Sequence, residues 1–128
     1  MGNKNKAKGT RAESRVVKYL DSQGVLAKRK ALSGSKDEGD IELPGLGLCL
    51  EVKTGKQTAN YNRSQLEEWL RQRKAEETNA NQSCYLVIVR HGRKISDAEV
   101  WYHSDPTSAR VMRYLDEFCE MLNNPRTQ

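Results

Sequence analysis

The segment from Gly39 to Lys53 constrains the fold of this chain most, because it has the pattern of a β-hairpin. Two apolar runs flank a turn that contains Pro44, Gly45 and Gly47, which are residue types that favour tight turns. The pattern therefore predicts two short antiparallel strands that lie next to each other in a sheet.

If the turn is centred between Gly45 and Leu46, residues whose numbers sum to 91 face each other across the two strands. Ile41 then faces Leu50, and Asp40 faces Glu51. Because side chains alternate along a strand, Glu51 and Lys53 share one face of the second strand. The hairpin is therefore expected to gather two carboxylates and one ammonium group on the same side of the sheet.

Two carboxylates directly across a strand pair repel each other, since their Cβ atoms are only about 5 Å apart. A divalent cation between Asp40 and Glu51 would turn that repulsion into a binding site of hard oxygen ligands, which suits Mg²⁺, with Mn²⁺ as a substitute. Lys53 would add a positive charge beside it. The same pattern also fits a solvated polar face with a Glu–Lys pair, and the pattern alone leaves both interpretations open.

The positive charge of the chain is concentrated near its amino terminus. The 128 residues have a formal net charge of +5. Residues 1–36 hold ten basic and two acidic side chains, whereas residues 37–128 hold twelve and fifteen. A strongly basic first third on a nearly neutral body favours a polyanionic partner, and nucleic acid is the simplest one.

The cysteine pattern and the hydropathy of the chain indicate where in the cell the protein is found. Cys49, Cys84 and Cys119 are odd in number and lack a Cys-x-x-Cys spacing, so they fit buried thiols better than a disulfide framework or a zinc site. No apolar run approaches the ~20 residues of a membrane span, and the polar start does not resemble a signal peptide. We therefore expect a cytoplasmic protein with no membrane partner.

The rest of the chain has the periodicity of a single domain. We expect a disordered basic arm over residues 1–8, one domain over residues 9–123 and a short tail over residues 124–128. The expected elements are a helix from near Thr10 to Gly24, strands at Val25–Ala31, Tyr85–Val89 and Glu99–Tyr102, a helix that starts at Ser64, and a last helix from Asp105-Pro106 that carries Val111, Met112, Leu115 and Phe118.

Glu13 has two possible roles in the first helix. Thr10-x-x-Glu13 fits a capping box, in which the carboxylate bonds to the backbone at the helix start. Glu13 also lies at the head of the apolar stripe of that helix, from which it could be aimed as a third carboxylate at the site on the sheet. The sequence leaves both roles open.

Several short stretches, taken in order, resemble the motifs of the PD-(D/E)XK nuclease superfamily, and within it those of the archaeal-type Holliday-junction resolvases. The resemblance covers about residues 8–70, and its matching stretches are Lys8-Gly9-Thr10-Arg11-Ala12-Glu13, Arg29-x-x-x-Ser33-Gly34-Ser35, Gly39-Asp40-Ile41, Leu50-Glu51-Val52-Lys53-Thr54 and Gln65-Leu66. It implies an α/β fold with a restriction-endonuclease-like core, in which helices flank a mixed central sheet of about five strands in the order α-β-β-β-α-β-β-α.

The resemblance also implies a role for each matching residue. Asp40 and Glu51 would coordinate Mg²⁺ together with the Val52 carbonyl, and Glu13 would be a further or a water-mediated ligand. Lys53 would steer the attacking water and stabilise charge on the phosphate, with Gln65 supporting the site from the next helix. Arg29 and Ser33 would contact the substrate near the scissile phosphate. The basic first third and the Ser-Gly-Ser loop add further expected DNA contacts, at Lys8, Arg11, Arg15, Lys28, Lys30, Ser35 and Lys36.

The activity that the resemblance implies is Mg²⁺-dependent hydrolysis of DNA in recombination or repair. A homodimer would make symmetric nicks in four-way junctions and leave 5′-phosphate and 3′-hydroxyl ends. The alternatives are a DNA nickase or restriction-like nuclease that acts on other DNA, and a DNA-binding module that keeps the fold without cutting.

Overall fold

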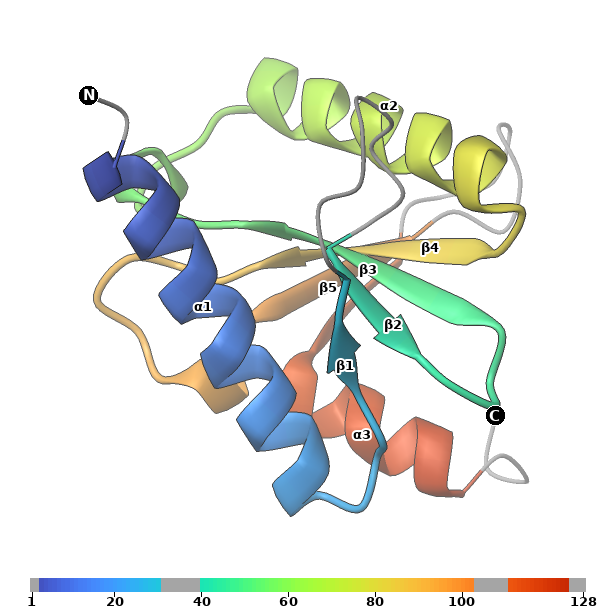
Figure 1. Cartoon of the computed structure of the whole chain (residues 1–128). Coiled ribbons are helices and arrows are strands. Elements are labelled where there is room, and N and C mark those ends of the chain that lie inside the picture. The colour runs from blue at the N-terminus through green and yellow to red at the C-terminus, as the bar shows by residue number, and fades with distance from the viewer. Residues whose placement is uncertain (1–2, 31–39, 103–110, 125–128) are drawn as a thin grey trace.

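The computed structural model describes residues 3–30, 40–102 and 111–124, with the backbone alone for residues 3–10 and 111. Over these residues the chain is an α/β protein with a mixed six-stranded sheet and three α-helices (Figure 1). None of the helices in these ranges is long and apolar enough to cross a bilayer. The elements are α1 (Asn3–Ser22), β1 (Lys28–Arg29), β2 (Ile41–Leu43), β3 (Leu48–Lys53), the 3₁₀ turn η1 (Lys56–Thr58), α2 (Arg63–Ala80), β4 (Ser83–Ile88), the 3₁₀ turn η2 (Ile95–Asp97), β5 (Glu99–Tyr102), β6 (Val111–Tyr114) and α3 (Leu115–Asn123).

The predicted hairpin is confirmed as β2 and β3. The two strands are antiparallel, and Ile41 pairs with Leu50 as the turn position requires. Gly45 and Gly47 have φ angles of 84° and 66°. Only glycine adopts this left-handed region without strain, so the turn glycines fix the register.

Helices cover both faces of the sheet (Figure 1). On one face, α1 and α3 pack with the sheet into a core that includes Val16, Leu50 and Phe118. On the other face, α2 packs Trp69 against Leu86 and its neighbours. Since both clusters include residues of β4, this strand is buried on both faces. The even positions of β3 therefore face α1 and α3, and the odd positions face α2.

The first helix begins earlier than the sequence pattern indicates. α1 starts at Asn3 and so includes residues 3–8, which the sequence pattern assigns to a basic arm. Thr10 lies inside the helix and cannot be its N-cap, which also excludes the capping-box role of Glu13. Alanine and lysine in this segment are good helix formers, and one interior Gly9 is not enough to stop the helix.

The second helix begins at Arg63, and its N-cap is Asn62 instead of Ser64. The side-chain oxygen of Asn62 accepts a hydrogen bond of 2.9 Å from the backbone N–H of Gln65. Ser64 and Asn62 are both good capping residues. The extended backbone of Asn62 at φ −98° and ψ 178° decides between them.

The last helix begins later than predicted, because Val111 and Met112 lie on strand β6. β6 pairs with β5 in an antiparallel ladder that joins Tyr114 to Glu99. A short apolar run fits a strand or a helix equally well, and pairing with the sheet decides for the strand. The sheet therefore has six strands where the sequence predicts about five, β1 is shorter than predicted, and Asp105-Pro106 lies outside the described residues.

The three cysteines have the predicted state. Cys49, Cys84 and Cys119 are free and buried. Cys49 and Cys84 are direct neighbours across the parallel pair of β3 and β4. They therefore act as apolar side chains in the core of the sheet.

The helix cap of α2 can be tested by substitution. Asn62→Ala removes the bond to the first turn and should lower the free energy of unfolding by about 0.5–2 kcal/mol. Ser64→Ala is the matched control, and it should leave stability almost unchanged because Ser64 is exposed inside the first turn. Urea denaturation followed by circular dichroism measures both. A larger loss from Ser64→Ala would contradict the assigned cap.

Candidate active site

Asp40 lies just before β2, where the hairpin ladder ends. Its backbone N–H donates to the carbonyl of Leu50 at 2.9 Å, and its carbonyl accepts from the N–H of Lys30 at 3.0 Å. The carboxylate oxygen Oδ2 accepts a hydrogen bond of 2.7 Å from the backbone N–H of Val52. Asp40 is thus bonded to both neighbours of Glu51 in β3, which brings its carboxylate beside that residue as the register predicts.

The Val52 carbonyl points toward the same edge of β3 as its N–H, because the N–H and C=O of one strand residue leave the strand on the same side. Since that N–H bonds to Asp40, the carbonyl also faces the Asp40 side. The backbone of β3 therefore adds a third hard oxygen beside Asp40 and Glu51.

Glu51 and Lys53 share the α2 face of β3, as predicted. Glu51 is buried, with 5% of its surface exposed. Its Oε1 forms an ion pair of 3.2 Å with the Nζ of Lys53. A buried carboxylate is stable only with such a partner. This pairing fixes the direction in which the lysine side chain extends.

Gln72 is a site residue that the sequence analysis misses. Its Oε1 accepts a hydrogen bond from the Nζ of Lys53. Gln65, the residue implied by the resemblance, receives the N-cap bond at its backbone, and no contact joins its side chain to Lys53 among the described residues. Gln65 and Gln72 lie two turns apart on the same side of α2, so their spacing is a signal that could have identified both.

The amide of Gln72 is itself held in place on α2. Its Nε2 lies 3.5 Å from Oε1 of Glu68, one turn earlier. Glu68 in turn forms an ion pair with Arg71. Because the amide nitrogen faces Glu68, the amide oxygen faces Lys53, which is the orientation that accepts a hydrogen bond from the ammonium group.

Glu13 lies beside Asp40 at the edge formed by α1 and β1. Its Oε1 forms an ion pair of 3.2 Å with the Nε of Arg29. Burial raises the pKa of the Glu13 carboxyl, the Asp40 charge raises it further, and Arg29 opposes both effects. Of the two roles that the sequence leaves open, this placement favours that of a third carboxylate near the sheet.

The donor set can be tested for its fit to a metal ion. Within the ranges that the structure describes, no three His, Cys, Asp or Glu side chains are grouped closely enough to hold a metal. Asp40, Glu51 and the Val52 carbonyl are the candidate ligands from the two strands, and Glu13 lies beside Asp40 as a further one. Mg²⁺ commonly takes one or two carboxylates and completes its octahedron with water and phosphate oxygens. The chemistry of these donors therefore fits Mg²⁺.

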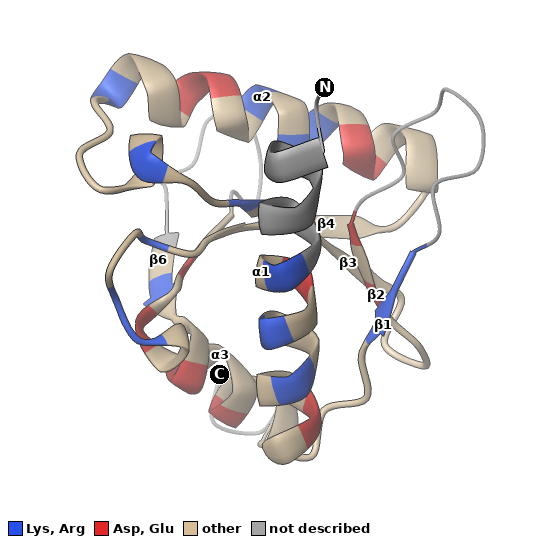
Figure 2. Ribbon diagram, turned by 60° about the vertical axis from the view of Figure 1, so that its left-hand side comes forward, with Lys and Arg blue, Asp and Glu red and all other residues tan. Residues whose placement is uncertain are grey.

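The predicted DNA-binding residues fall into two described groups. Arg11 and Arg15 are exposed on α1, and Lys28 and Arg29 are exposed on β1, with Lys30 half-buried at the end of the strand. Figure 2 shows the basic residues of α1 on the face turned toward the viewer, with basic β1 beside that helix. Ser33, Ser35, Lys36 and the side chain of Lys8 lie outside the described residues.

Comparisons of the chain with protein-family models, with curated proteins and with solved structures gave no match. The assignment of a function therefore depends on the geometry of the site.

The neighbourhood of Glu13 and Asp40 can be tested without any assay of activity. Asp40→Asn removes a negative charge and should lower the pKa of the Glu13 carboxyl, whereas Arg29→Gln removes a positive charge and should raise it. Carboxyl-detected NMR titration of the metal-free protein measures both shifts. An unchanged Glu13 pKa in Asp40→Asn would show that the two carboxylates do not share a site.

Proposed function

We propose that this protein is a metal-dependent DNA endonuclease of the PD-(D/E)XK type, with a restriction-endonuclease-like core, that cuts four-way DNA junctions. The observation that carries the proposal is the arrangement at the end of the β2–β3 hairpin. There Asp40 bonds to the backbone of Val52, and Glu51 on the same strand forms an ion pair with Lys53.

Asp40, Glu51 and the Val52 carbonyl would hold Mg²⁺. When bound, this ion lowers the pKa of a coordinated water and offsets charge on the phosphate. By holding the ion, the two carboxylates would set the position of the scissile phosphate relative to Lys53. Preorganised charges of this kind stabilise the charge that develops on the phosphate.

Lys53 is oriented for this role by its two partners. An ammonium group has three N–H donors. One is directed at Glu51 and one at Gln72. The third remains for the attacking water or for a phosphate oxygen, so the lysine can act on the reacting atoms while it stays attached to the protein.

The basic residues on α1 and β1 supply the phosphate contacts. Arg11, Arg15, Lys28 and Arg29 are exposed near the site, where they can contact the DNA backbone. Phosphate contacts depend on the shape of the nucleic acid and do not distinguish one base sequence from another. They suit a substrate that is recognised by its branched form.

A four-way junction as the substrate requires an enzyme with two-fold symmetry. Its resolution requires two cuts in strands of like polarity that are related by a two-fold axis. One chain of 128 residues supplies one such site. A homodimer with two-fold symmetry supplies two sites in matching orientation.

The metal site is tested by removing one negative charge at a time. Asp40→Asn and Glu51→Gln should abolish Mg²⁺-dependent cleavage of immobile four-way DNA and should retain or strengthen DNA binding, because each variant repels phosphate less. Glu120→Gln, an exposed acid on α3, is the matched control and should cut at the wild-type rate. Full cutting by either site variant would exclude the metal site.

The substrate is tested with the wild-type protein on labelled four-way and linear DNA. We expect paired nicks that are symmetric about the branch. Cleavage of the junction should be much faster than cleavage of linear duplex. Equal cutting of linear duplex, or an active enzyme that stays monomeric in sedimentation analysis, would exclude the junction and leave the restriction-like alternative.

The role of Gln72 is tested by Gln72→Met, which keeps the shape of the side chain and removes the oxygen that accepts from Lys53. Loss of a residue that orients a catalytic group typically lowers activity by about 10–100-fold. Single-turnover cleavage should slow by that order, while DNA affinity stays the same. The same measurement on Gln65→Met should give a smaller effect, and the reverse order would assign the support of Lys53 to Gln65.

A further inference from the structure

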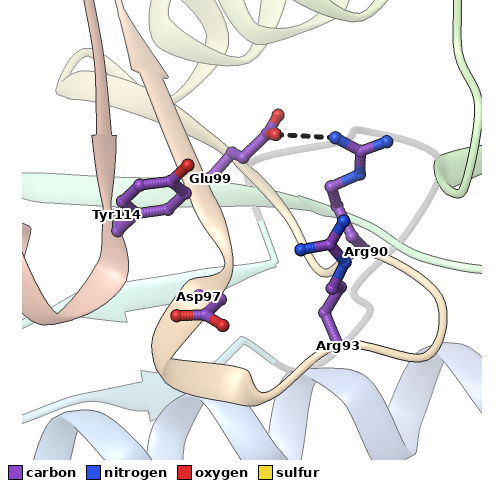
Figure 3. A pocket seen from close by; sticks show the side chains of 5 residues that line it. All are labelled: Arg90, Arg93, Asp97, Glu99 and Tyr114. Carbon is purple, nitrogen blue, oxygen red and sulfur yellow. Dashed lines mark hydrogen bonds and ion pairs between the residues drawn. The ribbon is translucent and has the colours of Figure 1, made fainter.

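A polar pocket of about 290 Å³ lies beyond the carboxyl end of β4, outside the candidate active site. Its walls come from the turn after β4, from η2, and from the facing ends of β5 and β6. Figure 3 shows the side chains that line it, which are Arg90, Arg93, Asp97, Glu99 and Tyr114.

Arg90 forms a fixed wall of this pocket. Its Nε donates to the carbonyl of Thr58 at 3.1 Å, another N–H donates to the carbonyl of Ala59, and Nη1 pairs with Oε2 of Glu99 at 3.2 Å. The guanidinium also lies over the ring of Tyr61, 5.3 Å from its centroid. A guanidinium has five N–H donors, so these bonds hold Arg90 rigidly and leave N–H groups for a ligand.

Glu99 does not repel an anion strongly from this pocket, because its charge is already compensated. It is buried, with 6% of its surface exposed. Besides Arg90, it accepts hydrogen bonds from the hydroxyl of Tyr61 and, at 3.0 Å, from Nε1 of Trp101. Burial and the hydrogen bond to Glu99 also raise the pKa of the Tyr61 hydroxyl.

Arg93 supplies the available positive charge. It is exposed, and its side chain extends toward Arg90 in Figure 3. No hydrogen bond or ion pair joins its guanidinium to another residue within the described ranges, Asp97 included. Two guanidinium groups that line the same pocket, one of them with no counter-ion among the described residues, can bind an oxyanion.

The sheet register relates this pocket to the candidate active site. Lys53 pairs with Ile88, and Ile88 pairs with Glu99, so the three residues form one row across β3, β4 and β5. Two strand spacings place the backbone of Glu99 about 10 Å from that of Lys53. Since DNA rises about 3.4 Å per nucleotide of one strand, this separation corresponds to no more than about three nucleotides.

We propose that the pocket binds a backbone phosphate of the substrate DNA, within about three nucleotides of the phosphate that is cut. This inference rests on the proposed nuclease function. Arg93 and the remaining N–H groups of Arg90 donate to the phosphate oxygens, and the hydroxyl of Tyr114, an exposed residue of the wall, adds a neutral donor. The pocket thereby aligns the strand with Lys53.

The test compares DNA binding by neighbouring charge variants in Ca²⁺ buffer, where binding is measured without turnover. Arg93→Gln should weaken binding and reduce the slope of log affinity against log salt by roughly 0.9, the loss of one phosphate contact. Lys94→Gln is the matched control, because this exposed neighbour does not line the pocket, and it should change the slope less. Asp97→Asn removes a negative charge from the wall and should strengthen binding.

The position of the phosphate is mapped with neutral methylphosphonate links. A link placed within three nucleotides of the cut should weaken binding to the wild type and leave the affinity of Arg93→Gln unchanged. Two results would overturn the assignment. One is an equal slope of log affinity against log salt for Arg93→Gln and the wild type, and the other is that no methylphosphonate position weakens binding to the wild type more than binding to Arg93→Gln. An NMR shift of Arg93 with inorganic phosphate but no such link effect would assign the pocket to a free phosphate ligand instead. Wild-type protein that binds DNA through Arg93 without cutting it in Mg²⁺ would contradict the proposed nuclease function alone.

Discussion

The antiparallel register of β2 and β3 decides where each group of the candidate site lies. With Ile41 opposite Leu50, the apolar positions of β3 join the core under α1 and α3, and Glu51 and Lys53 face α2. A slip of one residue would turn these two charged groups into the apolar core and turn Leu48, Leu50 and Val52 toward α2. The turn glycines and the apolar core therefore set the positions of the site residues together. The site residues themselves are not required for this register.

The ion pair of Glu51 and Lys53 has a cost in free energy for a small domain, because its charges are largely removed from water. Ion pairs in the interior contribute little net stability, because the removal of two charges from water offsets their attraction. This pair is nevertheless anchored at the lysine by Gln72, whose amide is oriented from the surface of α2. Such support is understandable if the direction of the ammonium group matters for function, and that is the physical reason to read these residues as an active site.

The sequence predicts local features of this fold better than contacts between distant segments. The hairpin, the buried face of α2 and strand β5 each follow from residues that are close in the chain. The start of α1, the cap of α2 and strand β6 do not, because two assignments fit the same residues and the tertiary structure selects one. The contacts of Arg90 with Thr58 and Glu99 join segments that carry no shared motif. The same holds for the contact between Lys53 and Gln72, since the pattern alone identifies Gln65 equally well.

The central claim is that a divalent cation binds between Asp40 and Glu51 at the end of the hairpin. Anomalous diffraction from crystals of the wild-type protein grown with Mn²⁺ tests it most directly, since it locates the ion without any assumption about the substrate. The account predicts one anomalous peak in contact with a carboxylate oxygen of each residue and with the Val52 carbonyl. A crystal with Mn²⁺ bound elsewhere, or with no ion between these carboxylates at saturating Mn²⁺, would contradict it.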